Sequence, residues 1–256
     1  MESEVDVVIP TFRRPEALAR CLAAMEGQTV APASIEVVDD SETDKGPAYT
    51  RNVGWRRGTA PIVAFTDDDC VPATDWIESI QRSLGGKTIG GIEGSVTIVT
   101  EDGSLSDMDP NPKDRWNRFK TANMAYRRDA LEAVGGFDER FFIHREDTDL
   151  AWRVINSGFP IEWVPDCIVH HPDRAGVQRV MPRSELLLYR CDRVKYTEVA
   201  AGMISFQSIR NGELASMRRG LRSYGDEFVV PLSRTESVSL WTRAFLRSIW
   251  RKFSNV

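Results

Sequence analysis

The chain has 256 residues, of which 41% are hydrophobic and 28% charged, and its net charge is −5 at pH 7. This length and composition predict one large folded domain, or one domain with an added piece, and they argue against intrinsic disorder. The acidic balance disfavours bulk nucleic-acid binding, and no run approaches the roughly 18 apolar residues of a membrane-spanning helix.

The compartment is predicted from the N-terminus and from the four cysteines. The acidic start of the chain enters a strand-like run at once and does not resemble a signal peptide. Cys21, Cys70, Cys167 and Cys191 lie far apart and form no C-x-x-C motif. We therefore expect neither a disulfide framework nor a zinc site, and a reducing cytosol fits best.

The first third of the chain alternates strand and helix patterns. Short β-branched runs predict strands at residues 5–9, 35–38 and 62–65. Helical spacing of apolar residues, with Pro15 and Thr74 as start signals, predicts helices at 15–26, within 45–58 and at 75–84. Alternating strands and helices predict a mostly parallel sheet with right-handed crossovers.

The remainder of the chain is less regular. We expect a strand around residues 92–98, a turn at 101–103 and a loop at 104–113. Asp129 and Glu132 resemble a capping box before a helix that Gly135 and Gly136 end. Further elements are a helix at 146–156, strand-like runs at 161–164 and 167–169, and helical patterns from 183 onward.

Aspartates gather where two of the predicted strands end. Asp39 and Asp40 follow the second strand, and Asp67, Asp68 and Asp69 follow the third. Ligands of open parallel sheets bind outside the carboxyl ends of the strands. Adjacent carboxylates repel one another, and a Mg²⁺ or Mn²⁺ ion shared with phosphate oxygens relieves that repulsion. The alternative is a solvated acidic turn, against which the position after a buried strand argues.

Seven segments together resemble a known family. VVIPTFRR (7–14), VVDDS (37–41), RNVG (51–54) and FTDDD (65–69) are similar to the nucleotide-binding half of family 2 glycosyltransferases, which have the GT-A fold. NMAYRR (123–128), GGFDERF (135–141) and EDTDLAWR (146–153) resemble the acceptor half. The resemblance covers about residues 4–175 and depends on the order and spacing of the motifs together.

The resemblance implies a fold and a division of the chain. The fold would be a GT-A-like α/β domain at residues 1–180, with a mixed, mostly parallel sheet flanked by helices. Residues 1–100 would form its nucleotide-sugar and metal half, and residues 101–180 its acceptor half. A helical extension would follow at 181–256.

The family also implies roles for residues of the donor side. Pro10 and Thr11 would line the nucleotide, Asp40 would accept a hydrogen bond from the base, and Arg51 would lie near the base or phosphates. Because Asp40 can accept from a base N–H, uridine or deoxythymidine diphosphate sugars are the favoured donors.

The metal site and the catalytic residues are implied in the same way. Asp67 and Asp69 would form the D-x-D motif around Mn²⁺ or Mg²⁺, Asp68 would touch ribose or metal, and His170 would complete the metal site. Asp147 would be the catalytic base. Glu146 and Asn123 fall in the acceptor-half motifs and are the candidate acceptor contacts.

Several residues have a plain structural alternative. Glu146 and Asp147 lie near a helix start, where acids complement the helix dipole. His170 and His171 lie at a strand end, and alternation along the strand points them to opposite faces, so the choice between them stays open. Cys70 and Cys167 have no evident partner and are interpreted as small packing residues.

The predicted reaction is a metal-dependent, inverting sugar transfer to a hydroxyl acceptor, with a glycan or lipid-linked glycan as the expected acceptor class. A carboxylate would deprotonate the hydroxyl, and the cation would stabilise the leaving diphosphate. A nucleotidyltransferase is the first alternative, but residues 10–15 lack the glycine-rich loop of that class. A non-catalytic binding module is the second, and the intact aspartates argue against it.

The C-terminal segment at 241–256 is basic on an otherwise acidic chain. It carries Arg243, Arg247, Arg251 and Lys252 and no acidic residue. Aromatic and aliphatic residues recur between them at helical spacing, which predicts an amphipathic basic helix. Such a helix could lie at an anionic membrane surface, which would place the protein at the inner face of the membrane, or pack on its own domain or a second copy.

Overall fold

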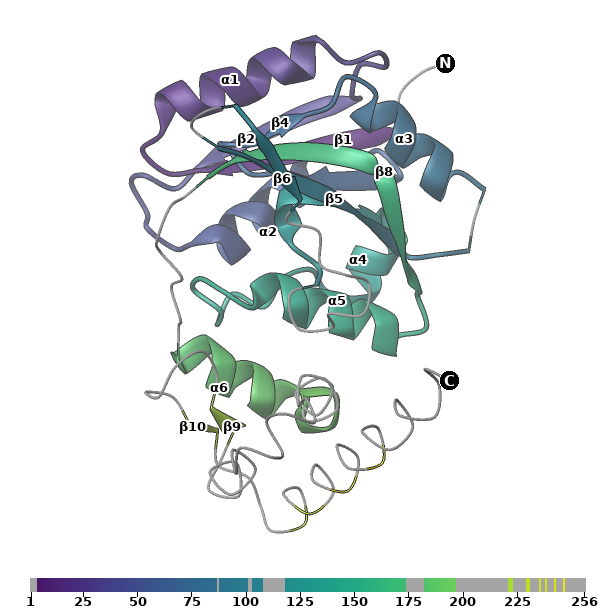
Figure 1. Ribbon diagram of the computed structural model, residues 1–256. Helices are drawn as coiled ribbons and strands as arrows, with labels where there is room; N and C mark the ends of the chain where they lie inside the picture. Colours follow the sequence, from purple (N-terminus) through teal and green to yellow (C-terminus); the bar gives the residue numbers. More distant parts are fainter. Residues whose placement is uncertain are drawn as a thin grey trace. The chain divides into compact units, whose positions relative to one another are not determined.

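The computed structural model describes residues 4–86, 88–100, 103–107, 118–173 and 182–196, with isolated positions beyond (221–222, 229–230, 235, 238, 242 and 246). The chain divides into two compact units. Residues 1–112 and 119–177 form the first, and residues 113–118 and 178–256 form the second. The first unit contains the large sheet with its helices (Figure 1).

The sheet of the first unit is mixed, and its strand order is β2-β1-β3-β7-β5-β8-β4. Its first three strands are parallel and run in the predicted places: β1 (Val5–Thr11), β2 (Ser34–Asp39) and β3 (Ile62–Phe65). Both β1 and β3 are buried on both faces, and apart from Asp6 near the start of β1 they appear in the sequence as hydrophobic runs.

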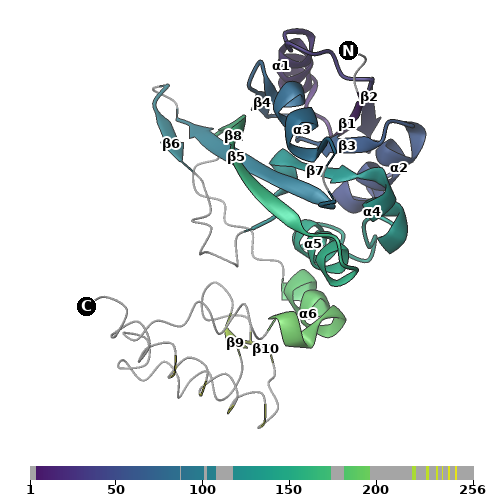
Figure 2. The ribbon, with the colours of Figure 1, turned by 90° about the vertical axis from the view of Figure 1, so that its right-hand side faces the viewer.

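The second half of the sheet mixes both directions. β7 (Met124–Arg127) lies antiparallel between β3 and β5 (Gly91–Val99), and β8 (Ile161–Pro172) pairs parallel with β5. The short β4 (Val71–Pro72) pairs antiparallel with the end of β8, and β6 (Leu105–Asp107) pairs antiparallel with β5. Figure 2 shows β5 and β8 running side by side, with β6 at the far end of β5. The predicted α/β architecture is confirmed.

Helices cover both faces of the sheet. On one face lie α1 (Pro15–Glu26) and α3 (Trp76–Leu84), which pack Cys21, Met25 and Ile80 among others into one core cluster. On the other lie α2 (Pro47–Arg57), α4 (Arg128–Val134) and α5 (Glu146–Asn156), whose apolar residues form a second cluster with Val63 and Phe65. Figure 1 shows the two groups of helices on opposite sides of the strands.

Three local predictions need correction. Part of the predicted loop at 104–113 forms β6, which pairs with β5. The two predicted runs at 161–164 and 167–169 belong to one strand, β8, whose pairing with β5 shifts at Gly94 and Ser95. The predicted capping box is absent from α4, because Asp129 pairs with Arg127 instead and no side chain caps the helix.

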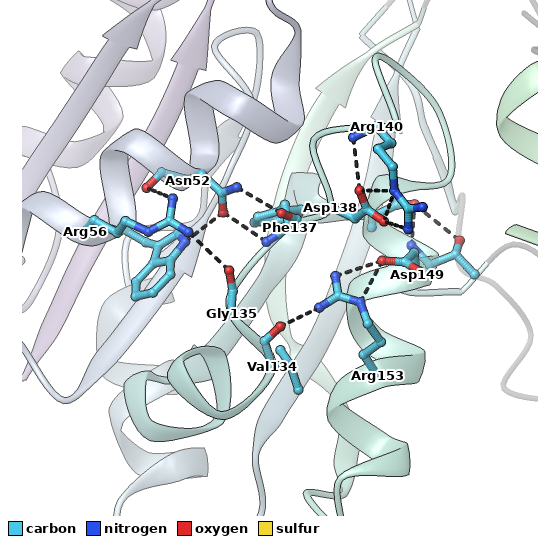
Figure 3. A network of polar contacts seen from close by, with 12 residues as sticks. Asn52, Arg56, Val134, Gly135, Phe137, Asp138, Arg140, Asp149 and Arg153 are labelled. Atoms are coloured by element: carbon cyan, nitrogen blue, oxygen red, sulfur yellow. Dashed lines mark hydrogen bonds and ion pairs between the residues drawn. The ribbon is translucent and has the colours of Figure 1, made fainter. Parts of the chain in front are cut away.

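Asn52 on α2 holds the loop that connects α4 to α5 (Figure 3). Its Nδ2 donates to the carbonyl of Phe137 at 2.9 Å and to Glu139 at 2.8 Å, and its Oδ1 accepts from Phe137 N at 2.9 Å and Trp55 Nε1 at 3.0 Å. Gly136 has a φ of 77°, and a Cβ there would lie 2.5 Å from Asn52 Oδ1. The glycine is therefore required by this contact as well as by its backbone conformation.

A second set of contacts in the same view joins α4 to α5. Arg153 on α5 donates to the carbonyl of Val134 at 2.9 Å and to Asp149 at 2.8 Å (Figure 3). Burial raises the pKa of Asp149, although Arg153 opposes that shift. The start of α5 is thus tied through α4 and the 135–141 loop to α2.

We expect Asn52→Ala to destabilise the protein by about 3 kcal/mol, because it leaves the buried Trp55 and Phe137 N–H groups without acceptors. Urea unfolding measures the change. Glu132→Ala on the exposed side of α4 is the matched control and should stay within about 0.5 kcal/mol of wild type. Equal stability of the two variants would contradict the structural role of Asn52.

Little of the second unit is described. It contains α6 (Pro182–Cys191) and a two-stranded pair, β9 (Leu221–Arg222) with β10 (Val229–Val230). Of the predicted basic helix, Thr242 and Leu246 are helical and Leu246 is exposed, while the other residues of 241–256 lie outside the described residues. Within the described part of the chain, no helix is long and apolar enough to cross a membrane.

Candidate active site

Four potential metal ligands meet at the carboxyl ends of the strands. Asp67, Asp69 and Cys70 follow β3, and His171 lies near the end of β8; their ligand atoms all lie within 4.8 Å of one another. The short strand β4 brings them together, because Val71 pairs with His170 on β8 and so fixes the preceding loop against that strand end. The predicted D-x-D pair therefore lies at the edge of the sheet where ligands bind.

His171 lies in this cluster, and the predicted His170 does not. The Nε2 of His171 is 3.6 Å from Asp69 Oδ1. Its Nδ1 lies 2.7 Å from the carbonyl of Pro172. A carbonyl can only accept, so Nδ1 carries the proton, and in the neutral ring Nε2 presents its lone pair on the side of Asp69. The geometry therefore favours His171 over the predicted His170 as the metal-ligand candidate.

Two buried carboxylates of the acidic triplet share one arginine. Arg14 Nη1 lies 3.1 Å from Asp68 Oδ1 and 3.1 Å from Asp69 Oδ2. Asp68 also accepts a hydrogen bond from the hydroxyl of Thr11 at 2.8 Å. Asp68 is consequently turned toward the end of β1, beside the predicted nucleotide-lining Thr11, and lies outside the ligand cluster.

Arg51 links the metal-ligand candidates to the start of α5. Its Nη2 donates to Asp67 at 2.8 Å and its Nη1 to Glu146 at 2.9 Å, with all of these groups in one ion-paired cluster. Burial works to lower the pKa of Arg51, but Asp67 and Glu146 outweigh it and the pKa rises. Burial and the neighbouring Asp147 raise the pKa of Glu146, against the pull of Arg51.

Asp147 stands on the first turn of α5, beside Glu146. Its Oδ1 accepts hydrogen bonds from Thr148 N at 2.6 Å and from the Thr148 hydroxyl at 3.2 Å. His144 and Arg145, the two residues before the helix, have φ values of 72° and 71°. Non-glycine residues seldom adopt this left-handed conformation, and such strain clusters at functional sites.

Asp40 does not lie free for a nucleotide base, contrary to its predicted role. Its carboxylate accepts hydrogen bonds from the Thr43 hydroxyl, from Lys45 N at 3.0 Å and from Gly46 N at 2.6 Å. The side chain is 4% exposed and organises the loop before α2. The neighbouring Asp39 is exposed instead, and hydrogen bonds from Ser41 lower its pKa.

Asn123 is a second correction, because the structure places it in the core and not at an acceptor surface. Its side chain is 2% exposed. The amide donates to the carbonyls of Ser95 at 2.7 Å and Cys167 at 2.8 Å, and it accepts from Trp76 Nε1 at 2.8 Å. With these partners, Asn123 joins η1 (Thr121–Asn123) to β5, β8 and α3.

Two residues of the site were missed by sequence reasoning. Arg14 had no assigned role, although it lies only three residues after Thr11, which ends the predicted nucleotide-lining segment. Cys70 was interpreted as a packing residue, and its position directly after the D-x-D motif was the available signal. It is fully buried and free, as are Cys21 and Cys167, and all four cysteines are unbridged.

One large cavity of the first unit lies elsewhere. It has a volume of about 1050 Å³ and is lined by residues at the amino ends of β1, β2 and β3, such as Glu4, Ser34 and Pro61. The ligand cluster lies at the opposite, carboxyl ends of these strands. Chemistry and topology therefore locate the site better than cavity size does.

Sequence comparisons find glycosyltransferases among the proteins similar to this chain. A family model described as the N-terminal domain of galactosyltransferase matches residues 104–173. The chain is 28% identical over 208 residues to the pre-mycofactocin glycosyltransferase of Mycobacterium tuberculosis, a match that covers 68% of this chain and 44% of that protein. It is 26% identical to the glycosyltransferase AglE of Haloferax volcanii, over 77% of this chain and 78% of that one.

A solved structure has the same fold. The mannosyltransferase PcManGT from Pyrobaculum calidifontis, in complex with GDP-Man and Mn²⁺, superposes with a TM-score of 0.55 and 17% identity, over 98% of this chain and 88% of that one. The fold is thus of the GT-A type. The sequence matches in turn show that the chain is similar to glycosyltransferases over much of its length. The chain spans less than half the length of the first relative named above.

Proposed function

We propose that the protein is a metal-dependent, inverting glycosyltransferase that moves a sugar from a nucleoside-diphosphate sugar to a hydroxyl acceptor. The observation that carries the proposal is the cluster of Asp67, Asp69, Cys70 and His171 at the carboxyl edge of a GT-A-type sheet. Asp147 lies on the neighbouring helix start, joined to this cluster through Glu146 and Arg51.

The residues of the cluster fit a divalent cation. Two carboxylates suit Mn²⁺ or Mg²⁺, and the imidazole adds a ligand that favours Mn²⁺ over Mg²⁺. The Nε2 lone pair of His171 and the Asp69 carboxylate are both electron donors 3.6 Å apart, and a cation between them would satisfy both. When bound, the cation would stabilise the negative charge that develops on the leaving diphosphate.

The remaining roles belong to side chains of this chain. Asp147 would accept the proton of the acceptor hydroxyl, because Thr148 holds its Oδ1 and orients the carboxylate. Glu146 has a buried Oε2 with no hydrogen bond among the described residues, which supports the predicted acceptor contact. Thr11 and Pro10, at the end of β1, would line the nucleotide.

The donor base is proposed to be uracil or thymine, and the acceptor a glycan or a lipid-linked glycan. The solved relative named above binds a guanosine nucleotide, so the fold accepts more than one base. Asp39, exposed beside Ser41, takes the place of Asp40 as the carboxylate that faces solvent at this end of β2. It can accept a hydrogen bond from the N–H of a uracil or thymine ring.

The experiment that tests the function has two stages. Thermal unfolding in the presence of Mn²⁺ and a panel of nucleotide sugars identifies the donor, because a ligand at 100 times its Kd adds about 2.7 kcal/mol to stability. Release of the nucleoside diphosphate on addition of hydroxyl acceptors then shows transfer, and the anomeric configuration of the product shows inversion. Release of pyrophosphate from a nucleoside triphosphate and a sugar phosphate would indicate a nucleotidyltransferase instead.

The two histidines give a sharp internal comparison. We expect His171→Ala to weaken Mn²⁺ binding at least about tenfold, since it removes a ligand atom beside Asp69. His170→Ala, one residue earlier on the same strand, should leave Mn²⁺ affinity within about twofold of wild type. Titration of Mn²⁺ by calorimetry or electron paramagnetic resonance measures both. The reverse order of effects would restore the original choice of His170.

A further inference from the structure

Arg14 is held to the acidic triplet in an unusual way. One nitrogen, Nη1, lies 3.1 Å from both Asp68 Oδ1 and Asp69 Oδ2. The arginine side chain is 46% exposed, whereas the two carboxylates are 6% and 7% exposed. Among the described residues, no other group pairs with this guanidinium. A half-exposed arginine therefore neutralises two buried aspartates from the solvent side.

The contrast with Arg51 shows that Arg14 is displaceable. Arg51 is buried, 5% exposed, and is clamped between Asp67 and Glu146. Moving it would leave charges uncompensated in the interior, which is costly. Moving Arg14 returns a half-exposed guanidinium to water, at little cost to the arginine itself. The two buried carboxylates that it leaves then need another positive charge, which a bound divalent cation would supply. Of these two arginines, Arg14 is the one that can leave.

The Arg14 guanidinium would repel a divalent cation bound to Asp69, because both are positively charged and both would contact the same carboxylate. Arg14 lies at the start of α1, three residues after Thr11, which is proposed to line the nucleotide. A diphosphate bound there offers oxygens that an arginine pairs with well. Pairing with the phosphates would release Arg14 from Asp68 and Asp69, and would leave the Asp69 carboxylate available to the metal.

We propose that Arg14 is the counter-ion of the metal site in the donor-free protein, and that a bound nucleoside diphosphate draws it from Asp68 and Asp69 to the phosphates. This inference rests on the proposed function. It makes the binding of metal and of nucleotide cooperative, because each favours the arrangement in which Arg14 has left the acids. Coupling is reciprocal, so Mn²⁺ and the nucleotide strengthen each other by the same factor.

The test is the Mn²⁺ affinity of Arg14→Gln, with and without saturating UDP or GDP, measured on the full chain by electron paramagnetic resonance. Without nucleotide, Arg14→Gln should bind Mn²⁺ about fivefold more tightly than wild type, because the competing charge is gone. With nucleotide, the advantage should disappear. The ratio of the two affinities, which is the coupling factor, should fall about fivefold or more, the lower end of common allosteric couplings.

Two further variants control for charge and for folding. Arg14→Lys keeps the positive charge beside the acids and should retain most of the wild-type coupling. Arg20→Gln removes one positive charge from the exposed face of α1 and should leave both Mn²⁺ affinities unchanged. Thermal unfolding of Arg14→Gln at saturating Mn²⁺ should match wild type, because the cation then compensates the two carboxylates that Arg14 pairs with in the wild type.

The outcomes separate this proposal from the proposed function. Wild-type Mn²⁺ affinity and coupling in Arg14→Gln, in a protein that binds nucleotide and transfers sugar, would overturn the role of Arg14 alone. Weaker Mn²⁺ binding by Arg14→Gln would also overturn it, and would make the arginine a support that positions the carboxylates. A wild-type protein that binds neither Mn²⁺ nor a nucleoside diphosphate would overturn both proposals.

Discussion

Replacing Asp147 with asparagine is expected to lower kcat by on the order of 10²–10⁴, the usual contribution of general-base catalysis. Asparagine has nearly the same shape and can still accept the Thr148 hydrogen bonds through its Oδ1. It cannot take a proton from an acceptor hydroxyl at neutral pH. Donor affinity should stay near wild type, because Asp147 lies outside the cluster of metal-ligand candidates.

Steady-state kinetics and a separate binding titration distinguish the possible roles of Asp147. Asp129→Asn, at an exposed ion pair on α4, is the matched control and should keep wild-type kcat. Wild-type turnover in Asp147→Asn would remove this residue from the mechanism. A loss of nucleotide and metal binding would instead assign it to the donor site.

Replacing Asp69 with alanine is expected to weaken Mn²⁺-dependent binding of the nucleotide by about 100-fold or more. Even the partners of metal ligands cost 10–100-fold in metal affinity when removed, so a direct ligand should reach the upper end of that range. Asp69 provides Oδ1 toward His171 and Oδ2 toward Arg14, and both contacts vanish in the variant. Arg14 would keep Asp68 as a partner, which should preserve the fold.

Calorimetric titration of nucleoside diphosphate with and without Mn²⁺ measures the effect, and circular dichroism checks the fold. Asp166→Ala, an exposed carboxylate on β8 that lies outside the cluster, should bind the nucleotide and Mn²⁺ as wild type does. If Asp69→Ala keeps the wild-type response to Mn²⁺, the D-x-D assignment is wrong, even where the enzyme proves active with another cation.

Where burial is strong, the sequence predicted the elements well. The strands at 5–9 and 62–65 correspond to β1 and β3, because a strand buried on both faces requires a largely apolar run. The strand at 35–38 corresponds to β2, which is only partly buried and was indicated by its β-branched residues. β7 was missed. Its four residues, Met124–Arg127, form a strand through pairing with β3 and β5, which are distant along the chain. A short apolar run does not itself distinguish strand from helix.

The site residues show the same difference between features that local sequence indicates and features that distant contacts determine. The acidic triplet was located correctly because strand ends are visible in the sequence. The choice of His170 over His171 followed the family resemblance, and the geometry favours His171 instead. The sequence pattern could not decide between them, because β8 carries an irregularity opposite Gly94 and Ser95, after which residues 168–172 resume pairing. Alternation counted from the start of the strand cannot be carried across such a shift. Similarly, the loop at 40–46 turns Asp40 inward through contacts that no local pattern reveals.

The Arg51 ion pairs and the Asn52 hydrogen bonds lie side by side on α2, a helix in which half of the buried residues are polar. The hydrogen bonds and ion pairs of these side chains must break before α2 can unfold locally. The proposed nucleotide half and acceptor half are therefore joined here as one cooperative unit for local unfolding. Amide protons of α2 and of the first turn of α5 should exchange with solvent through a common opening, and neither half can loosen without the other.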